Sequence, residues 1–202
     1  MELSNWYKII QKNIKPVTKL FDEVYNGGEI YDVGGNVGAF TDYVLSKYPD
    51  AKVHLFEPVS TFSTFLNEKY ADKPNVKVNL MGCGAAEGTV QISRDETNLG
   101  YNQIGRNVNT EEIAIIPLDS YIKDRGIGFI KMDVEMYEPQ VLTGLYNYIS
   151  TTKNLPYIVM EYVYKGENKD RWDEVFDWLF QYYEAFDYIQ HTNTTDILLK
   201  PL

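Results

Sequence analysis

A glycine-rich turn constrains the fold of this chain more than any other stretch. A short apolar run, Ile30–Val33, leads into the turn Gly34–Gly38, and a helical pattern with apolar residues three and four apart follows at once. A strand, a glycine turn and a helix form the first unit of a parallel α/β nucleotide-binding sheet. Gly34, Gly35 and Gly38 allow a tight turn and a close approach to a ligand. The following helix would point its N-terminal N–H groups at that ligand.

The residues around the turn narrow the choice of ligand. The dinucleotide fingerprint G-x-G-x-x-G is missing, which disfavours an NAD-dependent oxidoreductase, and the acidic Asp32 lies at the end of the strand. A carboxylate there would repel a pyrophosphate but would suit a cationic ammonium or sulfonium. S-adenosylmethionine carries both cations, so we expect Asp32, Gly34, Gly35, Asn36 and Gly38 to bind it. The alternative is a glycine turn that binds nothing.

A second acidic residue has the spacing expected of a ribose ligand. The buried-strand run Val53–Phe56 ends in Glu57-Pro58, and Glu57 follows Gly38 by roughly 20 residues. A carboxylate in this place can accept hydrogen bonds from both ribose hydroxyls. The alternative is a surface glutamate at a strand end, but the glycine turn favours the ribose role.

The middle of the chain offers an adenine wall and a long polar stretch. A third strand, Val76–Met81, ends in small residues, and Gly82 and Cys83 would lie beside the adenine. Nothing near Cys83 would make it a thiolate, so a small apolar liner is expected rather than a nucleophile. Gly88–Ser93 alternates like a further strand or hairpin arm, and the polar stretch Arg94–Thr110 is either a substrate loop or disordered.

Acidic residues end the next two predicted strands. Asp133 and Glu135 follow a central strand that contains Lys131, and Glu161 lies near the end of the strand Tyr157–Tyr162. A lysine in a central strand needs a carboxylate partner or loses its proton. The carboxyl ends of parallel strands are where α/β proteins bind ligands. Acids that cap following helices are the alternative, and they do not explain Glu161.

The remaining segments predict the outline of the fold. Leu3–Val24 forms one or two helices around Pro16, which either cover one side of the sheet or form a flap over the acceptor site. A helix is expected over Pro139–Ile149, and a second helix carries an apolar stripe from Trp172 to Tyr183. Final strands are expected near residues 186–190 and 196–200. We expect a single domain over 1–202, with N-terminal helices in 1–26 and a Rossmann-like core in 29–202.

Composition excludes several classes of function. The net charge of −10 argues against a nucleic-acid partner, which requires clustered basic residues. No apolar run reaches the ~20 residues of a membrane span, and the N-terminus lacks a signal-peptide pattern, so a cytoplasmic protein is expected. The single cysteine excludes an internal disulfide and a cysteine-based zinc site. Of the two histidines, His54 is expected to be structural, and His191 is a weak base candidate or a surface residue.

Several stretches together resemble the FkbM-type methyltransferases. The matching stretches, which span roughly residues 30 to 165, are Asp32–Gly38, Phe56–Pro58, Leu118–Ser120, Phe129–Glu135, Gln140–Gly144 and Met160–Glu161. The resemblance implies the class I methyltransferase fold: an α/β, Rossmann-like, seven-stranded, mostly parallel sheet with helices on both faces, here with an N-terminal helical extension. It also implies S-adenosylmethionine-dependent O-methylation, often of sugars in glycans or of natural products.

The chain departs from the family pattern at two places. Met136 stands where the family usually has a glycine after Asp-Val-Glu, on the presumed acceptor side. Ala85-Ala86 stands where the family often has an acid after the third strand, which would alter contacts near the adenine.

Methyl transfer to a hydroxyl assigns roles to the three acids. A nearby base must take the hydroxyl proton, and Glu135 or Glu161 is the candidate. Asp133 would bind the methionine ammonium or orient a saccharide or small-molecule acceptor. The three acids would alternatively hold Mg²⁺, which prefers oxygen ligands. A non-catalytic S-adenosylmethionine or nucleoside binder within a glycan-assembly complex is the competing hypothesis, and it would need no acid at Glu135 or Glu161.

Overall fold

The large sheet of the structure has seven strands, as expected for the class I methyltransferase fold. The structure is a computed structural model and describes residues 3–94, 102–105, 109–122, 125–164, 168–192 and 194–202. Its seven-stranded sheet has the order β3-β2-β1-β7-β8-β10-β9. The strands of this sheet are β1 (Glu29–Val33), β2 (Val53–Phe56), β3 (Val76–Asn79), β7 (Ile127–Met132), β8 (Tyr157–Tyr162), β9 (Tyr183–Gln190) and β10 (Thr195–Pro201). Neighbouring strands from β3 to β8 are parallel, whereas β10 is antiparallel to both β8 and β9. The predicted α/β, mostly parallel fold is therefore confirmed.

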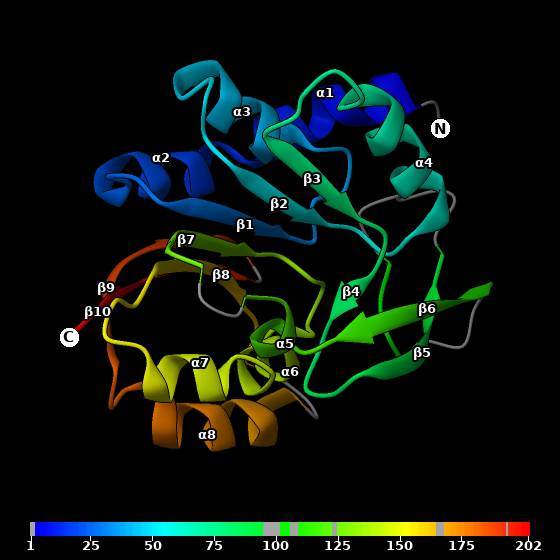
Figure 1. The fold of residues 1–202 in the computed structure, drawn as a ribbon. Coiled ribbons are helices and arrows are strands. Elements are labelled where there is room, and N and C mark those ends of the chain that lie inside the picture. Colours follow the sequence, from blue (N-terminus) through cyan, green and yellow to red (C-terminus); the bar gives the residue numbers. More distant parts are fainter. Residues whose placement is uncertain (1–2, 95–101, 106–108, 123–124, 165–167, 193) are drawn as a thin grey trace.

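Helices cover both faces of this sheet (Figure 1). The first face carries α1 (Leu3–Asn13), α2 (Lys15–Val24), α3 (Ala39–Lys47) and α4 (Ser60–Lys69). The second face carries α5 (Leu118–Ile122), α6 (Glu138–Thr143), α7 (Tyr146–Thr151) and α8 (Asn168–Leu179). Each face has its own apolar core, which includes Phe21 and Phe40 on the first and Leu142 and Trp172 on the second. The expected N-terminal helices are α1 and α2, and Pro16 lies in the first turn of α2, where its missing N–H is harmless.

A small sheet stands beside the carboxyl ends of β2 and β3 (Figure 1). It consists of β4 (Gly82–Cys83), β6 (Thr110–Ile116) and β5 (Gly88–Ser93), in that order. The strand expected at Gly88–Ser93 is confirmed, and it pairs antiparallel with β6. The sequence analysis missed β6, because its apolar residues follow directly on the polar stretch Arg94–Thr110. Residues 95–101 and 106–108 of that stretch lie outside the described residues.

Two predicted helices end differently in the structure. The helix expected over Pro139–Ile149 is interrupted between α6 and α7 at Gly144, where a Cβ would overlap the carbonyl oxygen of Gly84. The last helix ends at Leu179, and Tyr183, the last residue of its apolar stripe, begins β9 instead. Tyr183 is buried there, and its hydroxyl donates to the Pro156 carbonyl at 3.0 Å, so a tertiary contact overrides the helical period.

Among the described residues, no helix combines the length and the apolar character needed to cross a membrane.

Candidate functional site

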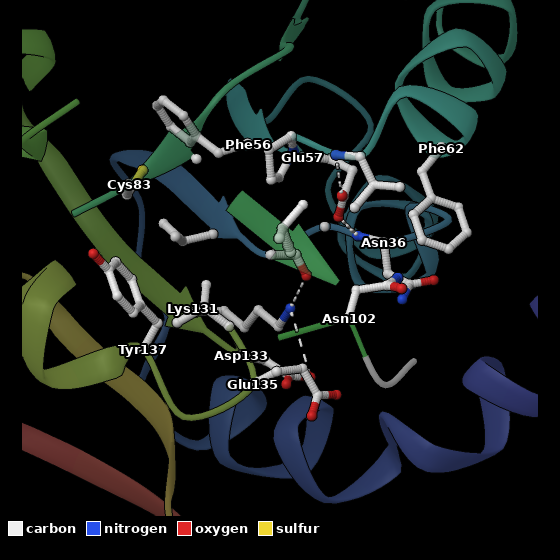
Figure 2. Close-up of a pocket in the computed structure, with 18 of the residues that line it drawn as sticks. Asn36, Phe56, Glu57, Phe62, Cys83, Asn102, Lys131, Asp133, Glu135 and Tyr137 are labelled. Atoms are coloured by element: carbon white, nitrogen blue, oxygen red, sulfur yellow. Dashed lines mark hydrogen bonds and ion pairs between the residues drawn. The ribbon is translucent and has the colours of Figure 1, made fainter. Parts of the chain in front are cut away.

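A cavity opens at the carboxyl ends of β1, β2 and β7, between the small sheet and the N-terminal helices (Figure 2). The space inside it amounts to about 900 Å³ when the open mouth is included. Most of the predicted ligand-binding residues line it, namely Gly34, Gly35, Asn36, Glu57, Pro58, Gly82, Cys83, Asp133 and Glu135. Segments that are far apart in the sequence therefore meet at one site.

The glycine turn is packed tightly against the end of β7. Gly34 has a φ of +77°, and a Cβ on it would overlap the carbonyl oxygen of Asp133. The amides of Gly34 and Gly35 both donate to the Phe56 carbonyl at 3.0 Å, which ties the turn to β2. Gly38 does not line the cavity, because its missing Cβ makes room for the Tyr70 hydroxyl. Gly38 thus packs the start of α3 against Tyr70, and its role in ligand binding stays a prediction.

Asp32 is fully buried and lies outside the cavity lining. Its Oδ2 accepts the Thr41 hydroxyl proton at 2.8 Å, and its Oδ1 lies 3.3 Å from the Lys131 Nζ. This placement is at odds with the expected direct contact between the Asp32 carboxylate and a ligand. The carboxylate instead compensates a buried lysine behind the turn.

Lys131 connects the turn to the acids of β7. Its Nζ donates to the Gly34 carbonyl at 2.6 Å and lies 3.9 Å from the Asp133 Oδ2 (Figure 2). Burial alone would lower the pKa of Lys131, but Asp32 and Asp133 outweigh it and raise that pKa. The predicted carboxylate partner of this lysine is therefore present, and the ammonium stays charged.

Glu57 faces the cavity from the end of β2, as a ribose ligand would. Its Oε2 accepts a hydrogen bond from the backbone N–H of Asn36 at 2.8 Å, and its Oε1 accepts one from the backbone N–H of Val59 at 2.9 Å (Figure 2). Burial raises the pKa of Glu57 to about 7, although the two amide hydrogen bonds oppose the shift. Each carboxylate oxygen has a further lone pair, so Glu57 keeps the capacity to accept hydroxyl groups of a ligand.

The predicted adenine wall is apolar and partly built by the small sheet. Cys83 is buried, and burial raises the pKa of its thiol, in agreement with a liner rather than a nucleophile. The sequence analysis missed Ile92, Ile104 and Ile113, which line the same cavity. The alternation Ile113-Ala114-Ile115 is a strand signal that would have placed Ile113 on an inner face.

The loop after β7 brings acids together under strain. Glu135 lines the cavity, and the Asp133 side chain is 48% exposed at its edge. Burial, followed by the charges of Asp133, Glu161 and Glu138, raises the pKa of Glu135 to about 9. Glu135 and Met136 have φ values of +55° and +74°, a left-handed conformation that favours glycine. The departure from the family pattern at Met136 thus coincides with backbone strain.

Glu138 is a buried acid that the sequence analysis missed. Its Oε1 accepts the Val134 amide at 2.9 Å, so it closes the loop after β7 on itself. Its Oε2 has no hydrogen-bond partner within the described part of the chain, and burial raises the pKa of Glu138 to about 8. Its position in the first turn of α6, four residues after Val134, is the sequence feature that could have predicted this contact.

Glu161 is close to these acids but does not line the cavity. It lies opposite Asp196 in the β8–β10 pair, and Asp196 accepts a 2.8 Å contact from the His191 Nε2. Burial and the charge of Asp133 raise the pKa of Glu161 to about 7. Of the two predicted base candidates, only Glu135 faces the space where an acceptor would lie.

The magnesium alternative finds no support in this geometry. Among the residues that the structure describes, no three His, Cys, Asp or Glu side chains form a group that could hold a metal ion. Asp133, Glu135 and Glu161 are therefore not placed as a metal site, because Asp133 points to Lys131 and Glu161 faces Asp196.

His54 lies away from the cavity, as expected of a structural residue. Its ring nitrogens contact the Tyr121 hydroxyl at 2.8 Å and Glu29 at 3.0 Å, and its ring stacks on Tyr31.

The N-terminal helices do more than cover the sheet. Leu20 and Phe21 of α2 are fully buried, as expected of a covering helix. Ile10 of α1 and Ile14, between the two helices, line the cavity. Both expected roles of this segment, cover and flap, are thus consistent with its position.

Comparison with known proteins identifies the family. The model of the "Methyltransferase FkbM domain" matches residues 32–189. "Methyltransferase 1" of Beauveria bassiana is 27% identical over 143 residues, which covers 57% of this chain and 57% of that protein. The chain thus spans little more than half the length of this relative.

Solved structures share the fold. The methyltransferase FkbM from Methylobacillus flagellatus has a TM-score of 0.60 and 19% identity, over 86% of this chain and 44% of that one. A putative rRNA-methylase from Clostridium thermocellum has a TM-score of 0.58 and 13% identity, over 93% and 96%. Fibrillarin from Aeropyrum pernix, solved with natively bound S-adenosyl-L-methionine, has a TM-score of 0.55 and 12% identity, over 87% and 67%. Because the family model matches most of the chain and the fold agrees, the chain belongs to the methyltransferase FkbM domain family.

Proposed function

We propose that this protein is an S-adenosylmethionine-dependent O-methyltransferase that acts on a hydroxyl of a saccharide or another small molecule. The observation that carries the proposal is the convergence, on one cavity, of the glycine turn, the buried Glu57 and the strained Glu135. The first two features suit a nucleoside with a cationic tail, and the third suits removal of a proton.

The cofactor end of the cavity suits S-adenosylmethionine better than a dinucleotide. Glu57 would accept the ribose hydroxyls, while Pro58, Gly82 and Cys83 would enclose the adenine. Asp133, half exposed at the edge, would attract the methionine ammonium. A pyrophosphate would meet Glu57 and Asp133, and among the described lining residues its basic partner would be Lys131, which Asp32 already neutralises.

Glu135 is the base in this proposal. When bound, S-adenosylmethionine would supply a methyl group on a sulfonium: the acceptor oxygen would gain the bond to the methyl carbon, and the sulfur would keep the electron pair of the broken bond. The hydroxyl proton passes to the Glu135 carboxylate, which lines the cavity. A carboxylate with a raised pKa is a stronger base than an ordinary one, so crowding by Asp133, Glu161 and Glu138 serves the reaction.

The charge of the protein favours an uncharged or cationic acceptor. The net charge is −10, and acids surround the end of the cavity at which Glu135 lies. A nucleic-acid backbone would meet repulsion there, because phosphates need clustered lysine and arginine. A sugar hydroxyl carries no charge and can donate hydrogen bonds to carboxylates.

Calorimetry and a transfer assay test the proposal. S-adenosylhomocysteine and S-adenosylmethionine should bind, and NAD should not. NAD binding more tightly than either would end the proposal. Labelled S-adenosylmethionine offered with a panel of sugars should then transfer its label to a hydroxyl. Cofactor binding without transfer to any member of the panel would favour the non-catalytic binder.

A further inference from the structure

Helix α1 lies outside the residues 32–189 that the family model matches, yet it touches the cofactor turn. We propose that Trp6 of α1 is a positioning residue for the cofactor, which acts through Asn36 on Glu57. The inference rests on the proposed function and extends the site to a segment that the family pattern does not include.

A chain of two hydrogen bonds connects α1 to the ribose end of the cavity. Trp6 is only 6% exposed, and its indole Nε1 donates to the Asn36 Oδ1 at 2.9 Å. The Asn36 amide in turn donates to the Glu57 Oε2 at 2.8 Å (Figure 2). Asn36 has a φ of +50°, so its backbone sits in a narrow left-handed well. The hydrogen bond from Trp6 holds the side chain of Asn36. It therefore also fixes the direction of the backbone N–H of Asn36, and with it the Glu57 carboxylate that accepts this N–H.

Further contacts hold α1 firmly against the same turn. The Tyr7 hydroxyl donates to Asp42 of α3, and the Lys69 ammonium lies 4.3 Å from the centre of the Tyr7 ring. Lys69 also donates to the Val37 carbonyl, within the turn, at 2.9 Å. Because α1 and the turn share these partners, α1 is a rigid support for Trp6 rather than a loose cover.

The position of Trp6 predicts which step of the reaction it affects. The indole is not among the residues that line the cavity, whereas Asn36 and Glu57 are. Loss of the indole N–H should loosen the cofactor site without touching Glu135. The KM for S-adenosylmethionine should therefore rise while kcat changes little.

The variant Trp6→Phe, in the full chain, removes the N–H and keeps an aromatic ring. We expect S-adenosylhomocysteine affinity to fall about three- to tenfold, the effect of one neutral hydrogen bond, with Tm nearly kept. The matched control is Trp178→Phe in α8, where the indole packs on Tyr146 away from the cavity, and its affinity should equal that of the wild type. Trp6 should also report binding directly: S-adenosylhomocysteine should change tryptophan emission in the wild type and in Trp178→Phe but not in Trp6→Phe.

A double-variant cycle separates positioning from simple packing. Asn36→Gly removes the acceptor of the indole bond and accepts a positive φ, and it should weaken S-adenosylhomocysteine binding by itself. If Trp6 acts through Asn36, then adding Trp6→Phe to Asn36→Gly causes no further loss. If Trp6→Phe weakens binding as much in Asn36→Gly as in the wild type, or leaves the affinity of the wild type unchanged, the positioning role of Trp6 is overturned while the proposed function stands. Failure of the wild type to bind S-adenosylhomocysteine overturns the proposed function together with it.

Discussion

The two ends of the cavity differ in how their charged groups are compensated. At the cofactor end, buried charges have partners: Asp32 meets Thr41 and Lys131, and Glu57 accepts two backbone amides. At the acceptor end, like charges crowd together, since Asp133, Glu138 and Glu161 all raise the pKa of Glu135. Two consecutive residues there also hold a left-handed backbone without being glycine.

The contrast assigns a different task to each end. Under the proposed function, the paired charges and the tied backbone would form a cofactor site that needs little rearrangement on binding. Crowded acids and backbone strain cost stability, and such costs are typical of sites where chemistry takes place. The four variants below either break this contrast or sharpen it.

Glu135→Gln should give the largest effect. The change keeps size and hydrogen bonding but removes the base, so we expect kcat to fall by about two orders of magnitude or more. Affinity for S-adenosylhomocysteine should stay nearly unchanged, because cofactor binding uses the other end of the cavity. Glu161→Gln is the matched variant: since Glu161 does not line the cavity, its loss of kcat should be smaller. Full activity in Glu135→Gln would remove this acid from the chemistry.

The pH dependence of activity and stability in the wild type also tests the role of Glu135 as the base. Burial and neighbouring acids raise the pKa of Glu135 to about 9, and only the deprotonated form can accept a proton. The value of kcat/KM, which reports ionising groups of the free protein, should therefore rise with pH up to about 9, and this rise should vanish in Glu135→Gln. A group whose pKa is raised on folding stabilises the fold below its ordinary pKa and loses that contribution as pH rises. Glu135→Gln should accordingly flatten the fall in stability between the ordinary value of 4.5 and about pH 9, as measured by denaturant titration.

Gly34→Ala tests the rigidity of the cofactor end. A Cβ would overlap the Asp133 carbonyl oxygen, which is backbone of the neighbouring strand end and cannot turn aside, and φ is +77°. We expect the free energy of unfolding to fall by about 3 kcal/mol or more, with cofactor binding lost. Gly88→Ala is the control, because no atom of the described residues lies within 4 Å of its added Cβ. Equal stability of the two variants in thermal unfolding would contradict this account of the turn.

Glu57→Gln tests the paired carboxylate directly. An amide nitrogen cannot accept the Asn36 or Val59 N–H, so one backbone donor loses its partner and the ribose loses an acceptor. Calorimetry should show S-adenosylhomocysteine affinity reduced about 10- to 100-fold, the usual range for a hydrogen bond to a charged group. Glu111→Gln is matched chemically, because Glu111 also accepts a backbone amide, that of Ser60, but lies outside the cavity lining. A similar loss of affinity in Glu111→Gln would show that the effect is not specific to the ribose position.

The sequence located the residues that line the proposed cofactor end of the cavity better than those of the proposed acceptor end, and the reason is physical. Glycines in a turn and an acid after a buried strand are local signals, so Gly34 and Glu57 were found from spacing alone. The orientation of a buried side chain depends on partners far away in the chain, which is why Asp32 was expected to face the ligand and instead faces Lys131 and Thr41.

The acceptor end and the walls depend on tertiary contacts that no local pattern contains. Glu161 was predicted as a strand-end acid, but it pairs with Asp196 of the neighbouring strand and is not among the residues that line the cavity. Ile113 belongs to a strand that the sequence analysis missed, and the bond from Trp6 to Asn36 joins residues 30 positions apart. The parallel sheet itself was predictable, since buried strands alternating with amphipathic helices have few other ways to pack.

Met136→Gly should give the smallest effect and the clearest measure of strain at the acceptor end. Met136 has a φ of +74°, where an L side chain costs about 1–2 kcal/mol, whereas glycine adopts this region freely but costs about 0.5–1 kcal/mol in chain entropy. The net gain in unfolding free energy should be about 0.5–1 kcal/mol, or a Tm higher by roughly 1–4 °C in a chain of this size. Asn109→Gly is the control, because Asn109 also has a positive φ, +47°, but asparagine tolerates this conformation and should gain less. Two outcomes for kcat separate the possible meanings of this strain. If Met136→Gly is more stable and keeps kcat, the strain is incidental to catalysis.

If stability rises while kcat falls, the strained loop positions Glu135, and the contrast between the two ends of the cavity includes the backbone as well as the charges.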